Sequence, residues 1–379
     1  MTTTTPAAVT RIGMPKWGLS MTEGHLIVWL VEEGAAVSEG DDLVEVETEK
    51  INGVVEAPTA GTLRRQVVTP GTVVPVGALL GVIADPEVPD AEIDAFVEQF
   101  QASFVPGEEE EEEAGPRAQT VDVGTRRIRY VRRGDGPQVI VLVHGFGGDL
   151  DNWMFNADSL AEQHTVITPD LPGHGESSKD VGAGTVDEFV GVLRGFLDAV
   201  EVPRAHLVGH SLGGAVVLAF ALADPARVAS VALIDSAGLG ERANSEYIDG
   251  FVAANRRREL QQVLRLLFGN PDLVTRRLVD DVLKYKRLDG VNEALHAVAN
   301  GCFPDGRQAT VLADRLGELS VPLLVMWGEQ DQIIPVADAE VARGHGRVEV
   351  LPNVGHSPHM EAAHDVNRLL RQFVEGATQ

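Results

Sequence analysis

Cysteine is almost absent from this sequence, because Cys302 is the single one among 379 residues. One cysteine cannot form an intrachain disulfide, so the fold must depend on its core, and a reducing compartment such as the cytoplasm is the simplest expectation. The first fifteen residues contain no basic start followed by an apolar run, so no signal peptide is expected. No apolar run approaches the ~20 residues of a membrane span, and a protein that does not cross a membrane is predicted.

Positive charge is also scarce. The 31 lysines and arginines are outnumbered by 57 acidic residues, which gives a net charge of −26. Such a chain repels phosphate backbones and anionic lipid surfaces, so neither nonspecific nucleic-acid binding nor membrane docking is expected. A length of 379 residues exceeds what one small core normally uses, and two or more domains are predicted.

The clearest candidate for a domain boundary is the stretch VPGEEEEEEAGPRAQT, residues 105–120. Six consecutive glutamates repel one another, which favours an extended, solvated linker over the alternative of an acidic helix end. Just before this stretch, apolar side chains recur at helical spacing, namely Ile93, Phe96, Val97, Phe100 and Phe104. They predict a short amphipathic helix over residues 89–104 that packs on a neighbour or docks a partner.

An internal repeat precedes the helix. Gly34, Val37, Gly40, Leu43 and Val46 match, at one offset of 37 residues, Gly71, Val74, Gly77, Leu80 and Ile83. Each half has the pattern of a strand, a turn at glycine and a second strand. The two halves predict a small β-sandwich or flattened barrel with approximate twofold symmetry. Lys50 follows the matched block of the first half, at a predicted hairpin turn in VEVETEKINGVVEAP.

Residues 9–85 resemble the lipoyl domain of 2-oxo-acid dehydrogenase-type complexes, through MPKWGLSMTEG, VEEGAAVSEGDDLVEVETEK, APTAGTL and VTPGTVVPVGALLGVI. In that family a lysine at the hairpin tip carries lipoate in amide linkage, which implies Lys50 as the attachment site. The related fold that carries biotin has methionine on both sides of its lysine. Glu49 and Ile51 stand there in this sequence, so lipoate is favoured over biotin. An ordinary solvated hairpin lysine is the remaining alternative.

From residue 121 onward the pattern changes to apolar strands alternating with amphipathic helices, which predicts a parallel α/β sheet over residues 121–379. The sharpest feature is Gly-His-Ser-Leu-Gly, residues 209–213, between the apolar strand AHLV and the small-residue helix GGAVVLAFAL. This is the setting that a G-x-S-x-G elbow requires, so Ser211 is the predicted nucleophile. A chance glycine–serine turn is the alternative.

A serine nucleophile needs a base, and the base needs an orienting acid. Asp331 closes the strand LLVMWGEQD, and His356 lies in the loop NVGHSPHME that follows the last strand. These two residues complete the predicted triad with Ser211, and Asp235 and His359 are the alternatives for acid and base.

The stretch HGFGG, residues 144–148, suits an oxyanion loop. The backbone N–H groups of Phe146 and Leu212 are predicted to face the carbonyl oxygen as it gains charge. His144 is expected to make a structural hydrogen bond in that loop. No metal site is expected.

Residues 121–379 resemble the α/β-hydrolase superfamily through the oxyanion loop, the GHSLGG elbow, and the acid and histidine in this order. Members with aspartate at the elbow attack alkyl halides or epoxides, so Ser211 implies esters, thioesters or amides instead. A polar helical insertion at about residues 236–319 occupies the place of the family's lid. Residues 241–315 carry 12 basic and 11 acidic side chains. The basic runs at residues 256–258, 276–277 and 284–287 could meet a polyphosphate such as coenzyme A, or be solvated helix faces.

The combination, with residues 86–120 as helix and linker, resembles the dihydrolipoamide acetyltransferase subunits of bacterial acetoin dehydrogenase complexes. That family implies transfer of an acetyl group from lipoyl-Lys50 to coenzyme A. It implies as partners a thiamine-diphosphate-dependent acetoin-cleaving component, dihydrolipoamide dehydrogenase and a lipoate-attaching enzyme, and a homo-oligomer is expected. The His-x-x-x-Asp-Gly signature of pyruvate-type acyltransferases is absent, so transfer must fall on the hydrolase-like part. A lipoyl-tethered ester or thioester hydrolase, and a lipoyl carrier with a non-catalytic second domain, are the alternatives.

Overall fold

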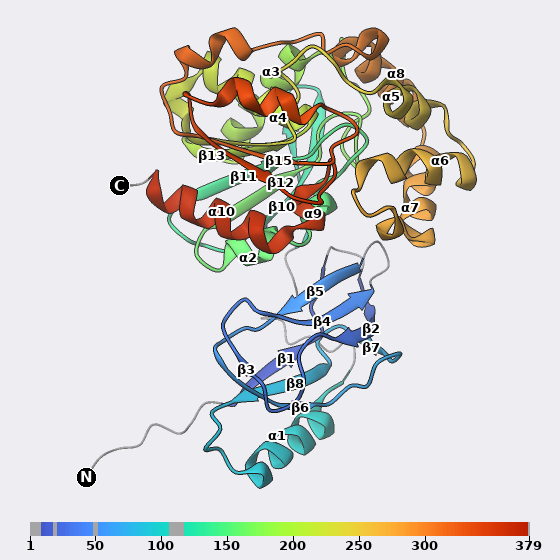
Figure 1. Cartoon of the computed structure of the whole chain (residues 1–379). Coiled ribbons are helices and arrows are strands. Elements are labelled where there is room, and N and C mark those ends of the chain that lie inside the picture. Colours follow the sequence, from blue (N-terminus) through green and yellow to red (C-terminus); the bar gives the residue numbers. More distant parts are fainter. Residues whose placement is uncertain (1–8, 18–20, 48–51, 106–116, 378–379) are drawn as a thin grey trace. The chain divides into compact units, whose positions relative to one another are not determined.

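The computed structural model describes residues 9–17, 21–47, 52–105 and 117–377 (Figure 1). The chain divides into two compact units, Met1–Gly115 and Pro116–Gln379, and each is described by itself. Within the described ranges, no helix has both the length and the apolar character needed to cross a bilayer.

The first unit consists of two four-stranded antiparallel sheets, with strand orders β1-β8-β6-β3 and β5-β4-β2-β7. Their strands are β1 (Thr10–Gly13), β2 (Glu23–Trp29), β3 (Ala36–Val37), β4 (Asp42–Glu47), β5 (Asn52–Glu56), β6 (Gly61–Gln66), β7 (Val73–Pro75) and β8 (Leu79–Ala84). Alternate side chains form one core, in which Leu26, Leu43, Leu63 and Leu80 are fully buried. The predicted small β fold is confirmed.

The internal repeat of the sequence is also a repeat of the structure. The offset of 37 residues carries β2, β3 and β4 onto β6, β7 and β8. The strand order of one sheet, β5-β4-β2-β7, then corresponds position by position to that of the other, β1-β8-β6-β3. The repeated glycines share a left-handed backbone, with φ of 87° at Gly34 and 86° at Gly71, and of 84° at Gly40 and 81° at Gly77. Only glycine adopts this conformation without steric cost, which explains why glycine recurs at these positions.

Helix α1 (Asp90–Ser103) packs on its own unit. Ile93 is fully buried in a cluster with Leu79 and Val82 of β8. The guanidinium of Arg64 contacts Asp90 at 2.8 Å, which anchors the first turn. The predicted helix is therefore confirmed, and the sheet covers the apolar side that carries Ile93.

The second unit contains an eight-stranded sheet of order β16-β15-β14-β13-β11-β12-β10-β9. Pairing is parallel from β12 to β16, whereas β10 pairs antiparallel with β9 and β12. The strands are β9 (Gln119–Val123), β10 (Arg126–Arg133), β11 (Val139–Val143), β12 (Thr165–Pro169), β13 (Ala205–His210), β14 (Val228–Ile234), β15 (Leu323–Gly328) and β16 (Arg347–Leu351). The predicted α/β architecture is confirmed, with an antiparallel β-hairpin added at one edge.

Helices cover both faces of this sheet (Figure 1). On one face, α2 (Ala157–Ala161) and α10 (Ala363–Gly376) pack on a core formed with β11, β13, β14 and β15. The other face carries α3 (Val186–Ala199) and α4 (Leu212–Ala223). The polar insertion between β14 and β15 forms four further helices, α5 (Ser245–Ala253), α6 (Arg257–Leu264), α7 (Arg276–Lys286) and α8 (Val291–Cys302), and α9 (Pro358–Glu361) precedes α10.

Several histidines of the second unit are buried, and among them His144, His174, His210 and His359 are each at most 5% exposed. Burial lowers the pKa of His144 to about 4 and that of His174 and His359 to about 3, and it holds the pKa of His210 well below its usual range. These rings are therefore neutral in the folded protein at pH 7.

We expect the free energy of unfolding to fall as the pH drops from 7.5 to 5.5. Below about pH 6.5 the unfolded chain binds protons at these histidines and the folded chain does not, a loss of up to about 1.4 kcal/mol per pH unit for each group. His359→Phe removes one such group, whose ring lies 4.7 Å from the Trp153 ring. The variant should lose less stability over this pH range in urea titrations followed by circular dichroism. An equal loss in variant and parent would contradict the argument.

Candidate active site

Ser211 occupies a strained turn between β13 and α4. Its backbone has φ 53° and ψ −119°, a region that non-glycine residues rarely adopt. Neighbouring segments hold this turn, because the Ser211 N–H donates to the Ile234 carbonyl at 3.0 Å and the Ser211 carbonyl accepts from the Ala237 N–H at 2.9 Å. The serine predicted as nucleophile thus lies on an elbow at the carboxyl end of the sheet.

The glycines of the elbow are required by close backbone approach. A Cβ on Gly209 would overlap the Gly213 carbonyl oxygen, and a Cβ on Gly213 would overlap the carbonyl oxygens of Val143 and His144. Strand β13, helix α4 and the end of β11 therefore meet at distances that only glycine permits.

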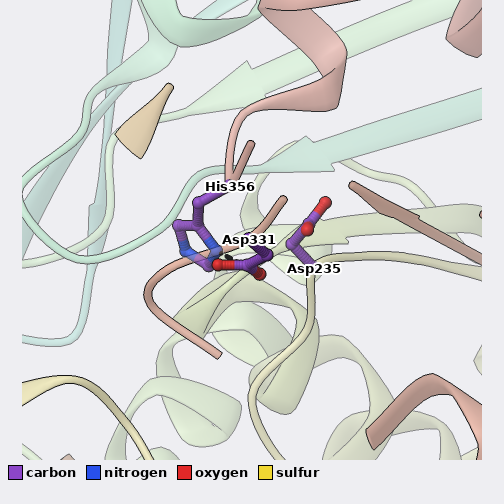
Figure 2. Close-up of side chains that lie close together, drawn as sticks. All are labelled: Asp235, Asp331 and His356. Atoms are coloured by element: carbon purple, nitrogen blue, oxygen red, sulfur yellow. Dashed lines mark hydrogen bonds and ion pairs between the residues drawn. The ribbon is translucent and has the colours of Figure 1, made fainter. Parts of the chain in front are cut away.

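Asp331 and His356 are in direct contact (Figure 2). The His356 Nδ1 lies 2.8 Å from the Asp331 Oδ2, and both side chains are buried. The Asp331 Oδ1 accepts from the backbone N–H of Ile333 at 2.7 Å and of Ile334 at 3.1 Å. Burial alone would raise the pKa of Asp331, but the contact with His356 and these hydrogen bonds bring it below its usual value. An ionised Asp331 accepts the hydrogen of the His356 Nδ1, and Nε2 is then the ring nitrogen that can act as a base.

Asp235, the alternative acid in the sequence, lies beside Asp331 rather than taking its place (Figure 2). One ligand atom from each of Asp235, Asp331 and His356 lies within 4.8 Å of the others. The Asp235 Oδ1 accepts from the Gly328 N–H at 3.0 Å. Burial and the charge of Asp331 raise the pKa of Asp235 well above its usual value, which favours the protonated form of this carboxyl beside the anion.

The same three side chains are the one group within the described ranges with the spacing to share a metal ion. Among these three, His356 and Asp331 are joined by a hydrogen bond, which suits the acid and base of a catalytic triad.

The elbow and the histidine loop are joined by His210, whose Nε2–H donates to the His356 carbonyl at 2.7 Å. The Ser211 side chain is 6% exposed, and its hydroxyl makes no hydrogen bond to another residue of the described ranges. Such contacts often tighten only when substrate binds. The structure thus brings Asp331 and His356 together and places Ser211 on the strand end that contacts the His356 backbone.

Glu361 holds the loop of His356 in place through hydrogen bonds to backbone N–H groups. This carboxylate accepts from the Gly355 N–H at 2.8 Å and from the Gly269 N–H of the lid, also at 2.8 Å. A Cβ on Gly355 would overlap the backbone at residues 268–269. His359, the alternative base, is fully buried, its ring lying 4.4 Å from the His210 ring. No local pattern in the sequence distinguishes Glu361 for this role.

The HGFGG loop lies against the elbow, since a Cβ on Gly145 would be 2.9 Å from the Ser211 Cβ. The neutral ring of His144 holds the loop, as predicted. Its Nδ1–H donates to the Gly145 carbonyl at 2.8 Å, and its Nε2 accepts from the Leu171 N–H at 2.9 Å.

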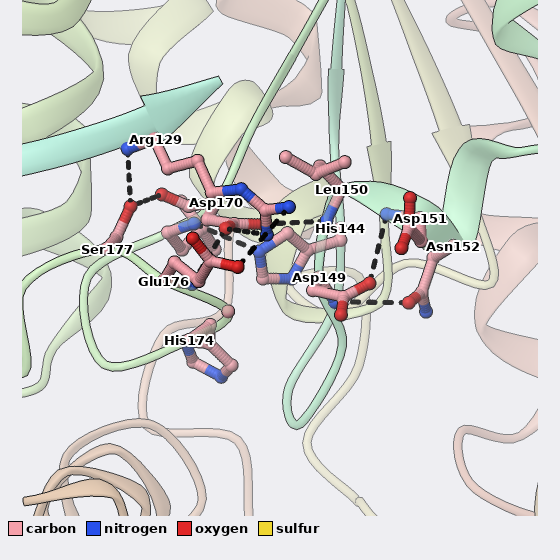
Figure 3. A network of polar contacts seen from close by, with 12 residues as sticks. Arg129, His144, Asp149, Leu150, Asp151, Asn152, Asp170, His174, Glu176 and Ser177 are labelled. Carbon is pink, nitrogen blue, oxygen red and sulfur yellow. Dashed lines mark hydrogen bonds and ion pairs between the residues drawn. The ribbon is translucent and has the colours of Figure 1, made fainter. Parts of the chain in front are cut away.

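A buried carboxylate, Asp170, organises the loops around this site (Figure 3). It accepts from the Leu150 N–H at 2.8 Å and from the Glu176 N–H at 3.0 Å, and it contacts the Arg129 guanidinium at 3.2 Å. The segments after β11 and β12 are thereby fixed to each other and to β10. The sequence analysis missed Asp170, although its position directly after an apolar strand is a usable signal.

The lid contacts the oxyanion loop through α5. The Tyr247 hydroxyl donates to the Phe146 carbonyl at 3.5 Å, and the rings of Phe251 and Phe146 lie 5.7 Å apart. Lys286 of α7 is buried and caps the carboxyl end of α5, where its Nζ donates to the carbonyls of Phe251, Val252 and Ala254. Burial lowers the pKa of Lys286 to about 8. The interpretation of the whole run 284–287 as a phosphate contact was therefore wrong for Lys286.

Lys50 lies outside the described residues. The strands on either side of it are described, and β4 pairs antiparallel with β5 so that Glu47 faces Asn52. The four residues between them connect the two strands of a hairpin.

Comparison with known proteins agrees with both halves of the chain. A family model described as the alpha/beta hydrolase fold matches residues 138–363, and the biotin/lipoyl model described as biotin-requiring enzyme matches residues 10–83. The second unit also resembles the solved meta-cleavage product hydrolase from Pseudomonas fluorescens IP01, with a TM-score of 0.64 and 23% identity over 68% of this chain and 98% of that one. This likeness supports the fold.

Two relatives match the chain over nearly its full length. The dihydrolipoyllysine-residue acetyltransferase component of the acetoin cleaving system of Cupriavidus necator is 47% identical over 99% of this chain and 100% of its own. The protein of the same description from Pseudomonas putida is 48% identical over 95% of this chain and 97% of its own. With a lipoyl-type unit before an α/β-hydrolase unit, the chain belongs to the family of dihydrolipoyllysine-residue acetyltransferase components of acetoin cleaving systems.

Proposed function

We propose that this protein transfers an acetyl group from a lipoyl group on Lys50 to coenzyme A, through a triad of Ser211, Asp331 and His356. The observation that carries this proposal is the buried 2.8 Å contact between His356 and Asp331, next to the Ser211 elbow, in a chain that also contains a lipoyl-type unit. The proposed division of the chain is a lipoyl domain at 9–85, a helix and linker at 86–120, and an acyltransferase domain at 121–379 with its lid at about 236–319.

The first unit fits lipoate. A hairpin of two paired strands, β4 and β5, leads to and from Lys50, so its side chain can be presented on a short connection. The unit has the twofold arrangement of two four-stranded sheets, and Glu49 and Ile51 stand where the related biotin-carrying lysine has methionines. When attached, lipoate supplies the thiol that presents the acetyl group as a thioester.

In the first half-reaction His356 acts as the base. Its Nε2 takes the hydroxyl proton of Ser211, and the Ser211 Oγ forms a bond to the thioester carbonyl carbon. The N–H groups of Phe146 and Leu212 stabilise the oxyanion, at about 3 to 4 kcal/mol per donor. Leu212 opens α4, so its N–H has no acceptor within the helix. The carbon–sulfur bond then breaks, and His356 returns its proton to the departing sulfur, which leaves acetyl-Ser211.

In the second half-reaction His356 takes the thiol proton of coenzyme A. The sulfur attacks acetyl-Ser211, the bond from Oγ to carbon breaks, and the proton returns to the Ser211 oxygen. Asp331 stabilises the cationic ring of His356 in both halves, and its contact with His356 and its backbone hydrogen bonds favour the anion.

The family places the protein in a multienzyme acetoin cleaving system. The proposed partners are a thiamine-diphosphate-dependent component that cleaves acetoin, dihydrolipoamide dehydrogenase and a lipoate-attaching enzyme. Assembly as a homo-oligomer and a cytoplasmic location complete the proposal, the latter supported by the single, buried Cys302.

The deciding experiment starts from lipoylated, acetylated full-length protein. It measures acetyl-coenzyme A and free acetate with and without coenzyme A. We expect acetyl-coenzyme A to form faster than acetate, and Ser211→Ala to lower this rate at least about 1000-fold because the acyl-enzyme cannot form. Lys50→Arg is the control that removes the attachment site and leaves the triad unchanged. Acetate alone would show a lipoyl-tethered hydrolase, and full transfer in Ser211→Ala would show direct attack by coenzyme A with His356 as base.

The two carboxyls should respond differently to amidation. Asp331→Asn removes the anion that orients His356, so we expect kcat to fall about 1000-fold or more. Asp235→Asn has the same shape and keeps an acceptor for the Gly328 N–H, so kcat should stay within about 3-fold of the parent. Steady-state transfer assays with both purified variants test this contrast. A loss in Asp235→Asn as large as that in Asp331→Asn would make Asp235 an essential anion.

A further inference from the structure

A cavity of about 640 Å³ opens on the lid between α6 and α7. Five cationic side chains line it, together with the single carboxylate of Asp280, and they are Arg257, Arg276, Arg277, Lys284 and Arg287. They come from the three basic runs of the sequence, which the fold brings to one place. A net charge of −26 for the whole chain makes this cluster a local exception.

Helix α7 presents its cations on one face. Positions 276, 280, 284 and 287 follow one another at intervals of three and four residues, which aligns their side chains along the helix. On the other side, Val279 and Lys286 are buried against the lid. The cationic face is therefore the outer face of a well-packed helix, and its guanidinium groups are exposed around the cavity.

Helix stability accounts for only part of the cluster. Arg257 pairs with Asp280 through two hydrogen bonds of 2.7 and 2.8 Å, and Lys284 at the end of α7 is favoured by the helix dipole. Arg276 and Arg277 stand in the first turn, where the same dipole disfavours cations and where α7 has no acidic residue. A bound anion at this end of α7 would offset the unfavourable placement.

We infer that this cavity binds the phosphate groups of coenzyme A, the acyl acceptor. The inference rests on the proposed function, in which coenzyme A takes the acetyl group from Ser211. A pyrophosphate and a ribose phosphate together present several anionic oxygens, which the planar guanidinium group contacts in pairs. Asp280 in the lining and Asp281, which pairs with Lys284 at 2.9 Å, balance two of the five cations, and the remaining positive charge complements such a ligand.

The cavity is connected to the reaction centre by packed elements of the same unit. Lys286 of α7 donates to three carbonyls at the end of α5. From α5, the Phe251 ring packs on Phe146 of the oxyanion loop at 5.7 Å. The helix that carries three of the five cations, with Arg287 directly after it, is thus held, through one intervening helix, in a fixed position relative to the loop that would stabilise the oxyanion.

The test compares two double variants of the lipoylated full-length protein. Arg276→Gln with Arg287→Gln removes two charges from the cavity. Arg256→Gln with Arg258→Gln is the matched control, because both arginines are exposed, lie beside Arg257, and are not part of the lining. The acceptors are coenzyme A and pantetheine, which carries the same thiol without the nucleotide phosphates. Binding of coenzyme A to each protein is measured separately by calorimetry, which needs no turnover.

We expect the cavity variant to raise both the KM and the Kd for coenzyme A by about 10- to 100-fold, since two charge-assisted contacts are lost. Its kcat, and its KM for pantetheine, should stay close to those of the parent, and so should both constants of the control. An equal loss in the control, or an equal loss with pantetheine, would overturn the inference. Unchanged Kd in the cavity variant would also overturn it while leaving acetyl transfer itself established. A third outcome separates the two proposals. If the parent protein releases only acetate, but the cavity variant alone binds coenzyme A more weakly, then the cavity is a coenzyme A site and the proposed acetyl transfer is refuted.

Discussion

The left-handed backbone of Ser211 is the constraint on which the second unit depends. Such a conformation costs about 1 to 3 kcal/mol and persists only where its surroundings hold it. Here the next strand holds both sides of the turn, through the Ile234 carbonyl and the Ala237 N–H. Glycines at positions 209 and 213 let the elbow sit directly against the end of β11. The histidine loop, the oxyanion loop and the lid are then arranged around this one point.

Asp331 is the carboxylate that contacts His356 in the reaction centre. Burial beside this anion raises the pKa of Asp235, and four nearby histidines are neutral because they are buried. Neutral donors and acceptors can position the loops without competing with Asp331 for His356. This separation explains why the site tolerates so many titratable side chains within one core.

The sequence predicted the parts of this protein that local pattern determines. The repeat at an offset of 37 identified the two sheets, and the elbow motif identified the strand, turn and helix around Ser211. Spacing along the chain also identified Asp331 and His356, which the structure joins. The partnership of Asp235 with Asp331, the sharing of Glu361 between the lid and the histidine loop, and the burial of Lys286 all depend on which distant segments meet. No local pattern encodes contacts between segments that are distant in the sequence. For Lys286, the residue type alone would predict an exposed side chain.

The symmetry of the first unit has a consequence for how many groups it can carry. Under the twofold relation, the hairpin of β4 and β5 that leads to Lys50 corresponds to β8 and β1. Those two strands are not joined to each other, because the chain enters the unit at one and leaves it from the other. At one of the two equivalent corners the chain runs from β4 to β5 by way of Lys50, and at the other the unit is connected to the rest of the chain. The duplicated fold therefore has one corner available for an attached group, and it uses the equivalent corner for its connection to the rest of the chain.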